Sequence, residues 1–149
     1  MPVEDVVRWL CHDHSEAGEV TDCLREIMAR PPRGDRRQWV QELRTRFEDA
    51  MVSTRQHMDT MEAGGYLHPI LEARPSLAPQ VELLKHEHIE LKRLIDGIRI
   101  AVEELSPHDN LLMRDCCKRI ENLLSWIERH QEHETHIVLY VFAKDSETH

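Results

Sequence analysis

The sequence predicts an all-α protein that folds as an antiparallel, up-down four-helix bundle. Its composition indicates the class, because 40% of the 149 residues are hydrophobic, 32% are charged and only 5 are glycine. Such a chain suits a soluble helical protein better than a β-rich or a disordered one. Proline and glycine interrupt it at residues 30–35, 64–65, 74–79 and 106–109, which leaves four long segments with helical spacing. Short connections between long helices favour antiparallel neighbours.

The length and the net charge of the chain limit its domain organisation and its possible binding partners. A chain of 149 residues can bury a hydrophobic core of its own, so we expect one domain over residues 1–149. The formal net charge of −9 argues against a nucleic-acid partner. The acidic N-terminus lacks the pattern of a secretion signal and no long apolar run occurs, so we expect a cytoplasmic protein with no membrane partner. The oligomeric state stays open.

The first helix is expected to end before Pro31 and Pro32, which cannot continue a helix. A spacing of three and four residues defines its inward face. That face contains Val3, Val7, Leu10, His14, Ala17, Thr21, Leu24 and Met28. His14 therefore faces inward, whereas His12 does not.

The second helix is expected to begin at Asp35, which has capping-box spacing with Gln38. Its inward face contains Val40, Leu43, Phe47, Ala50, Thr54, His57 and Met61. Again one histidine, His57, lies on the inward face.

The third helix is expected to begin near Pro79. Its inward face contains Val81, Leu84, His88, Leu91, Ile95, Ile98, Val102 and Leu105. His88 interrupts this apolar face, and His86 points elsewhere.

The fourth helix is expected to be capped by Ser106, with Pro107 at its first position. Its inward face contains Cys116, Ile120, Leu123, Ile127, His130, Glu134, Ile137 and Val141. His130 and Glu134 lie one turn apart, so both side chains can reach one ion or one pair of ions.

Each expected helix thus carries one histidine on its inward face. The separation between His14 and His57 nearly equals that between His88 and His130, so two similar hairpins would bring the four rings to a common depth. Four buried imidazoles without a shared partner would leave several polar atoms unpaired, at about 1–3 kcal/mol each. A metal site removes this cost, and imidazole with carboxylate suits iron, manganese or zinc. The four cysteines lack CxxC spacing and are expected to be free thiols.

Four short motifs follow one another along the chain: "DH" at 13–14, "HMDTMEAGGYLHPIL" at 57–71, "EH" at 87–88 and "HQEHE" at 130–134. With them the chain resembles the hemerythrin-like family, also called the HHE cation-binding domain, over nearly its whole length. The resemblance implies an antiparallel four-helix bundle around a non-haem di-iron centre, bridged by carboxylates and a solvent oxygen, with iron expected ahead of manganese or zinc. The family's metal-ligand positions fall on His14, His57, His88, His130 and Glu134.

The second helix departs from the family pattern. The family usually has a glutamate four residues after the histidine, whereas this chain has Met61 there, followed by Glu62. Glu62 completes the set of metal ligands if a π-bulge near Gly64 and Gly65 turns it inward. If Glu62 is a surface acid instead, one bridging carboxylate is missing and Met61, a weak thioether ligand, faces the site. The centre is then expected to be mononuclear, loosely loaded with metal, or selective for another metal.

Several residues around the ligands have separate expected roles. Asp13 and Glu87 can each orient a histidine on an adjacent helix. The remaining histidines are expected at the surface: His12, His68, His86, His108, His133, His136 and His149. The residues one turn from a ligand are expected to wall the site: Leu10, Ala17, Leu84, Leu91, Ile127 and Ile137.

The resemblance implies a protein that binds or senses dioxygen or a related small oxidant. We expect binding or sensing rather than catalysis, because no general base is evident, although Glu62 could handle protons if it lies near the metals. Two alternatives stay open. One is a di-iron enzyme with peroxidase-like or iron-oxidising turnover, and the other is a helical interaction module that binds no metal.

Overall fold

The structure, a computed structural model, describes residues 2–30, 32 and 34–147, and these residues form helices and no strand. The elements are α1 (Val3–Ala29), α2 (Arg36–Ala63), α3 (His68–Ala73), the short 3-10 helix η1 (Pro75–Leu77), α4 (Ala78–Glu103) and α5 (Asn110–Glu147). The expected all-α class is confirmed.

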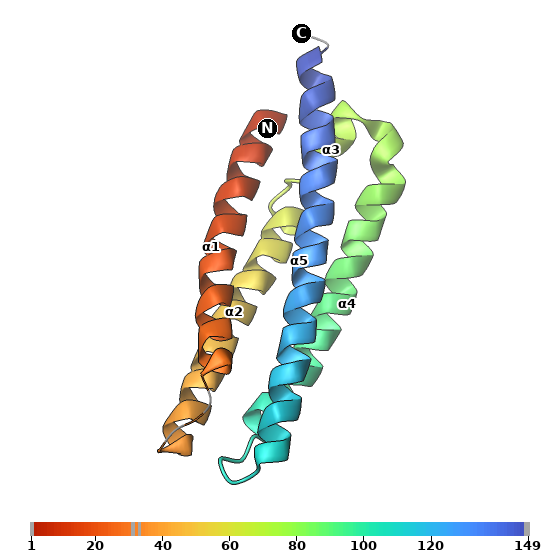
Figure 1. Ribbon diagram of the computed structural model, residues 1–149. Helices are drawn as coiled ribbons and strands as arrows, with labels where there is room; N and C mark the ends of the chain where they lie inside the picture. Colours follow the sequence, from red (N-terminus) through yellow and green to blue (C-terminus); the bar gives the residue numbers. More distant parts are fainter. Residues whose placement is uncertain (1, 31, 33, 148–149) are drawn as a thin grey trace.

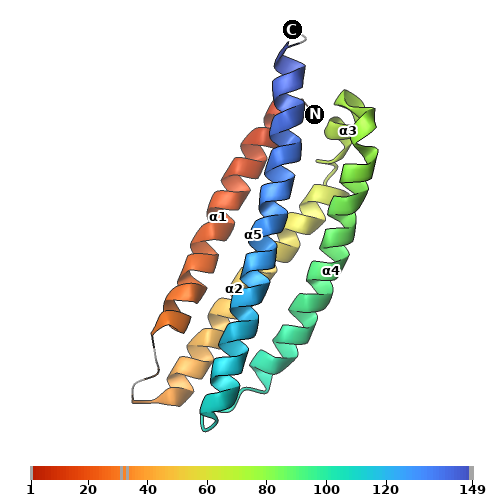
Figure 2. The same ribbon diagram turned by 45° about the vertical axis from the view of Figure 1, so that its right-hand side comes forward.

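The four long helices lie alongside one another (Figure 1). α1 packs on α2 and α5, and α4 packs on α5 and α2. The α1–α2 and α4–α5 connections lie at one end, and α3 lies at the other end, near the start of α1 (Figure 2). α1, α2, α4 and α5 therefore each contribute side chains to a common interior.

The starts of α2 and α5 test two expected caps. The Asp35 carboxylate accepts a hydrogen bond from the backbone N–H of Arg37 at 3.0 Å, so the expected cap of α2 is confirmed. The expected start of the fourth helix at Pro107 is wrong, because α5 begins at Asn110. Asp109 accepts there from the N–H of Leu112 at 3.0 Å, while the Ser106 hydroxyl accepts within the preceding turn. An aspartate also carries the negative charge that a helix N-terminus favours.

The segment between α2 and α4 contains a short helix that the sequence pattern does not predict. Gly65 begins the turn with φ +79°, a backbone conformation that glycine adopts without strain. At Gly64 a Cβ would lie 2.3 Å from the Thr60 carbonyl oxygen, so the close turn requires glycine. α3 then packs on α1 and α5, and Ile70 is fully buried. This segment closes one end of the interior.

The hydrophobic core consists of two clusters. One lies toward the α1–α2 connection and includes Leu24, Phe47, Ile95 and Leu123. The other lies toward α3 and includes Val6, Met61, Ile70 and Val138. A layer of histidines separates them on all four long helices. No helix among the described residues has the length and apolar content of a membrane span.

Candidate metal centre

Five residues at the middle of the interior form two groups that could hold a metal ion. One group is His14, His57 and Glu134, and the other is His88, His130 and Glu134. In each group one candidate ligand atom per residue lies within 4.8 Å of the others. Glu134, which is fully buried, belongs to both groups.

Helical periodicity explains why these residues meet. Each of the four long helices contributes its inward histidine, one turn away from apolar residues that belong to the core. The expected wall residues are all buried: Leu10, Ala17, Leu84, Leu91, Ile127 and Ile137. Their apolar side chains limit the access of water to the histidine layer.

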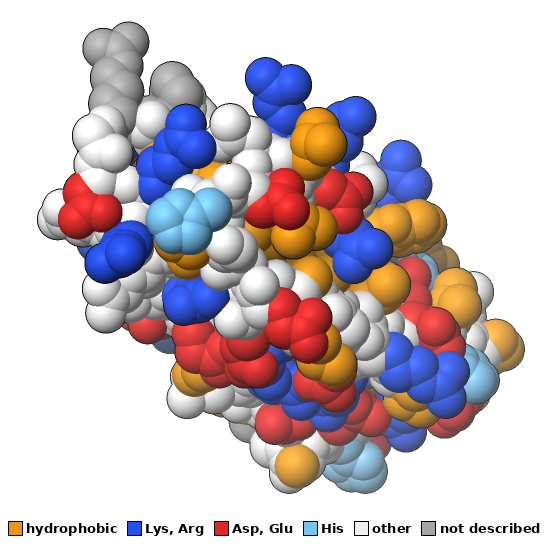
Figure 3. All heavy atoms as spheres, turned by 90° about the horizontal axis from the view of Figure 1, so that it is seen from below, with side chains coloured by type: hydrophobic (Ala, Val, Ile, Leu, Met, Phe, Trp, Pro, Cys, Tyr) orange, Lys and Arg blue, Asp and Glu red, His pale blue; other side chains and the backbone are white. Residues whose placement is uncertain are grey.

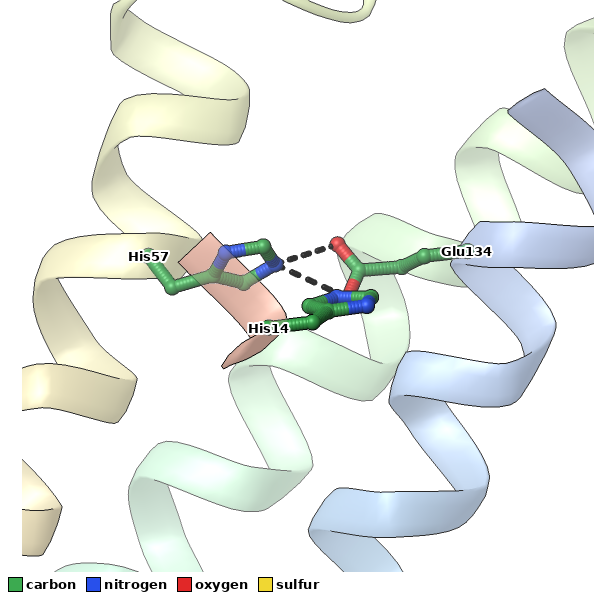
Figure 4. A group of neighbouring side chains, drawn as sticks. All are labelled: His14, His57 and Glu134. Atoms are coloured by element: carbon green, nitrogen blue, oxygen red, sulfur yellow. Dashed lines mark hydrogen bonds and ion pairs between the residues drawn. The ribbon is translucent and has the colours of Figure 1, made fainter. Parts of the chain in front are cut away.

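The first group centres on the carboxylate of Glu134 (Figure 4). The Nε2 atom of His57 lies 2.8 Å from both Glu134 oxygens. The Nε2 atom of His14 lies 3.4 Å from Oε1 of the same carboxylate. Two imidazoles from α1 and α2 thus converge on one carboxylate from α5.

The second group contains polar atoms without a partner. Within the described part of the chain, the Nε2 atoms of His88 and His130 are buried and make no hydrogen bond. His130 Nε2 comes no closer than 3.5 Å to a Glu134 oxygen, and the two rings meet edge to face with centroids 4.7 Å apart. Leaving two buried ring nitrogens unpaired costs about 1–3 kcal/mol apiece. A cation between them would satisfy both, so the site fits a metal ion.

Hydrogen bonds between helices orient the rings. The Nδ1 atom of His57 donates to Asp13 on α1, that of His88 donates to Glu62 on α2 at 2.8 Å, and that of His130 donates to Glu87 on α4 at 2.8 Å. In each pair the carboxylate comes from the long helix that precedes the histidine in the chain. A proton held on Nδ1 turns the lone pair of Nε2 toward the centre, which is the arrangement that metal-binding histidines use.

The fourth histidine, His14, has a weaker contact. Its Nδ1 atom lies 3.4 Å from the hydroxyl of Thr135 on α5. That hydroxyl also donates to the backbone carbonyl of Gln131 at 2.9 Å. The four contacts therefore run in order around the bundle, and the last one lacks a carboxylate.

Protonation in the absence of metal follows from these contacts. Burial alone would lower the pKa of His57, but hydrogen bonds to Asp13 and Glu134 outweigh it and raise the pKa to about 9. Burial would raise the pKa of the Glu134 carboxyl, but hydrogen bonds from His14 and His57 lower it to about 2. Burial lowers the pKa of His88, which keeps that ring neutral. A proton on His57 thus takes the place of positive charge from a metal.

A family model, the hemerythrin HHE cation-binding domain, matches residues 5–141. The chain belongs to this family. Comparisons with curated proteins and with solved structures gave no match. The matched range includes both candidate groups.

Glu62 is the member of the expected ligand set that lies in neither group. α2 is a regular α-helix through Ala63, without the π-bulge that would turn Glu62 inward. Its carboxylate accepts instead from the Nδ1 atom of His88. Met61, at the position where hemerythrin-family proteins usually have glutamate, is fully buried. A direct bond from Glu62 to a metal stays a prediction.

The contacts on the outer side of the candidate ligand histidines confirm one expectation and correct another. Asp13 and Glu87 do orient histidines on adjacent helices, as expected. The expected surface position of His133 is wrong, because its ring is half-buried and its Nδ1 atom lies 3.0 Å from Glu87. His133 lies three residues after His130, a spacing that places both rings beside the same neighbour. The other expected surface histidines are exposed, namely His12, His68, His86, His108 and His136, and His149 lies outside the described residues.

An aromatic stack beside the centre has no counterpart in the expected site. The Trp9 ring lies parallel to His57 with centroids 5.1 Å apart, and Tyr66 stacks on Trp9 at 4.2 Å. The stack covers one face of the His57 ring. Helical spacing gives no signal for it, because the stack depends on how α1 and the α2–α3 turn approach each other.

Proposed function

We propose that this hemerythrin-family protein is a non-haem di-iron protein that binds or senses dioxygen or a related small oxidant. Residues 1–149 would form one domain, and the long helices an antiparallel up-down bundle around the centre. The observation that carries the proposal is the pair of buried histidine groups joined by Glu134. One cation would be held by His14, His57 and Glu134, and the other by His88, His130 and Glu134.

The local charge supports two divalent cations rather than one. Glu134 lies within the centre, and three further carboxylates lie behind its histidines, those of the half-buried Asp13 and Glu87 and that of the more exposed Glu62. Four negative charges in and around a buried layer match the charge of two divalent ions. Buried carboxylates need such compensation, because removing charge from water is costly without a partner.

The donor types are compatible with iron, which we propose ahead of manganese or zinc. Imidazole and carboxylate ligands suit all three metals. Cysteine does not contribute: Cys116, which is buried, lies in the core cluster toward the α1–α2 connection, and burial raises the pKa of its thiol to about 11. The choice of iron rests on the resemblance to the hemerythrin family.

The residues of this chain have distinct roles in such a centre. Bound iron would supply the redox chemistry and an open position for a small oxidant. The histidines and Glu134 fix the ions, Asp13, Glu62 and Glu87 fix the rings, and the wall residues keep water out. These three outer carboxylates already accept hydrogen bonds from ligand histidines, so none of them is placed as a free general base. This favours binding or sensing over turnover.

The proposal is tested by loading the chain with Fe²⁺ without oxygen, removing free metal, and recording optical and Mössbauer spectra before and after oxygen is admitted. We expect two iron ions per chain and an oxygen-dependent absorption change. A steady-state assay with peroxide and a reductant should give negligible turnover. Sustained turnover would favour the alternative of a peroxidase-like enzyme, and less than one tightly bound ion per chain would favour a metal-free interaction module.

A further inference from the structure

The two halves of the centre differ in exposure. The His14 side chain is 18% exposed, whereas those of His88, His130 and Glu134 are at most 4% exposed. A ligand that reaches solvent can leave a metal and let water take its place. The half that contains His14 is therefore the half with access for exchange.

The two halves also differ in how firmly their rings are held. His88 and His130 each donate to a carboxylate at 2.8 Å. The Nδ1 atom of His14 instead lies 3.4 Å from an uncharged hydroxyl, that of Thr135, and this hydroxyl is already engaged with a backbone carbonyl. Hydrogen bonds to charged acceptors are roughly twice as strong as neutral ones. Rotation of His14 away from Glu134 is thus not opposed by a charged hydrogen bond at its Nδ1 atom.

A single protein carboxylate links the two groups. Met61, one turn after His57 on α2, is fully buried, and its thioether is a weak acceptor. Glu134 alone belongs to both groups among the described residues. Loss of an ion from one half therefore leaves the ligands of the other half in place.

Resting on the proposed di-iron function, we infer that the centre binds its two ions unequally. The half formed by His88, His130 and Glu134 retains its ion, and the half that includes His14 exchanges its ion with solvent. The protein then passes between a one-ion and a two-ion form as the supply of divalent iron changes. The two halves differ in this way because the Nδ1 atom of His14 lies beside a hydroxyl, whereas those of His88 and His130 donate to carboxylates.

The test measures release of Fe²⁺ from the anaerobically loaded full chain into an excess of a coloured Fe²⁺ chelator. The wild-type chain should release one ion in a fast phase and one in a slow phase. His14→Ala should load one ion and show the slow phase alone, and His88→Ala should lose the slow phase. His12→Ala, an exposed histidine on the same helix, is the matched control and should behave as wild type.

A gain-of-contact variant tests the cause without removing a ligand. Thr135→Asp places a carboxylate beside His14 and should slow the fast phase by about tenfold, the lower end of the effect of such outer contacts. Two ions that leave in one phase, or a fast phase that Thr135→Asp does not slow, would overturn the inference while leaving the di-iron proposal intact. A wild-type chain that never takes up a second ion would overturn the di-iron proposal itself.

Discussion

Glu134 is the residue that both candidate metal-binding groups share. It is fully buried, and its carboxylate stays ionised because histidines from two other helices donate to it. A charged carboxylate at this depth is stable only with such partners. The same feature makes it a ready ligand for cations. Position 134 therefore links the folding of the interior to the chemistry of the centre.

Replacement of His88 by alanine should lower both metal content and thermal stability of the iron-loaded protein. The ring supplies an unpaired Nε2 atom to the second group, and metal that binds only the folded state adds to stability. Metal analysis and calorimetry measure the two effects. His86→Ala, an exposed neighbour on α4, should change neither. Retained iron with unchanged melting in the His88 variant would remove His88 from the site.

Glu87→Gln should weaken metal binding about 10–100-fold, the range typical for the loss of a carboxylate behind a metal-binding histidine. Glu87 contacts both His130 and His133, so its charge orients two rings at once. Competition against a chelator of known affinity gives the size of the change. Glu90→Gln, which removes an exposed ion pair with Arg93 on the same helix, serves as the control. Equal affinities in the two variants would show that Glu87 does not position the ligand.

Metal-free protein should lose stability as the pH rises from about 6.5 to about 9. The pKa of His57 is about 9 in the folded chain against an ordinary value of 6.5, so its proton stabilises the fold fully below 6.5 and is lost above 9. Thermal melting between pH 6 and pH 10 measures the decline, and His57→Gln should reduce it. Metal binding has the opposite dependence, because it must displace this proton and so strengthens as pH rises. A melting temperature of the wild-type chain that does not change over this pH range would contradict the protonated, hydrogen-bonded state of His57.

The long helices were the most predictable elements. Their inward faces follow from a spacing that the backbone itself imposes, so all expected inward residues of the second and fourth helices are buried. On α1 the same pattern is looser, with Val7, Thr21 and Met28 only half-buried. The four inward histidines and Glu134 were predictable for the same reason. Periodicity fixes which side of a helix a residue occupies.

Contacts between helices were less predictable. The pairing of Glu62 with His88 depends on how α2 and α4 are rotated and displaced against each other, which no local spacing encodes. α3 spans six residues, too few to display a helical period, and it follows a turn at Gly64 and Gly65. The start of α5 was placed too early because Ser106 and Asp109 both have the chemistry of a cap, and only the fold decides between them.

Asp109→Ala should destabilise the chain by about 0.5–2 kcal/mol, the usual cost of losing a helix N-cap. Its carboxylate accepts from the N–H of Leu112 at the start of α5, the longest helix. Urea unfolding with unchanged m-value would measure the loss. Ser106→Ala, which removes only a turn contact, should have a smaller effect. A larger loss from Ser106→Ala would contradict the placement of the cap at Asp109.

Across the whole molecule, a polar layer divides the hydrophobic core into two clusters. The layer brings four imidazoles and the carboxylate of Glu134 between the two apolar clusters. Such a layer weakens the metal-free fold, and in the proposed centre a bound ion would add to the stability of the folded chain. The proposed function and the folding of the chain would therefore depend on the same residues.

Removal of metal should lower the melting temperature by about 5–10 °C. Binding at a hundredfold excess over the dissociation constant adds about 2.7 kcal/mol, and a chain of this size shifts by about 2–4 °C for each kcal/mol. Differential scanning calorimetry with and without chelator measures the change. Fe²⁺ should restore the melting temperature, and Mg²⁺, which prefers oxygen ligands, should not. Equal recovery with Mg²⁺ would show that the histidines are not the ligands.

The central claim is that the chain holds two ions through histidine groups that share one carboxylate. Equilibrium dialysis against Fe²⁺ without oxygen, followed by metal analysis, tests it most directly. The account predicts two ions per wild-type chain at saturation and less than one in Glu134→Ala. A wild-type chain that binds no more than one ion at saturation, or a Glu134→Ala chain that binds as much iron as wild type, would contradict it.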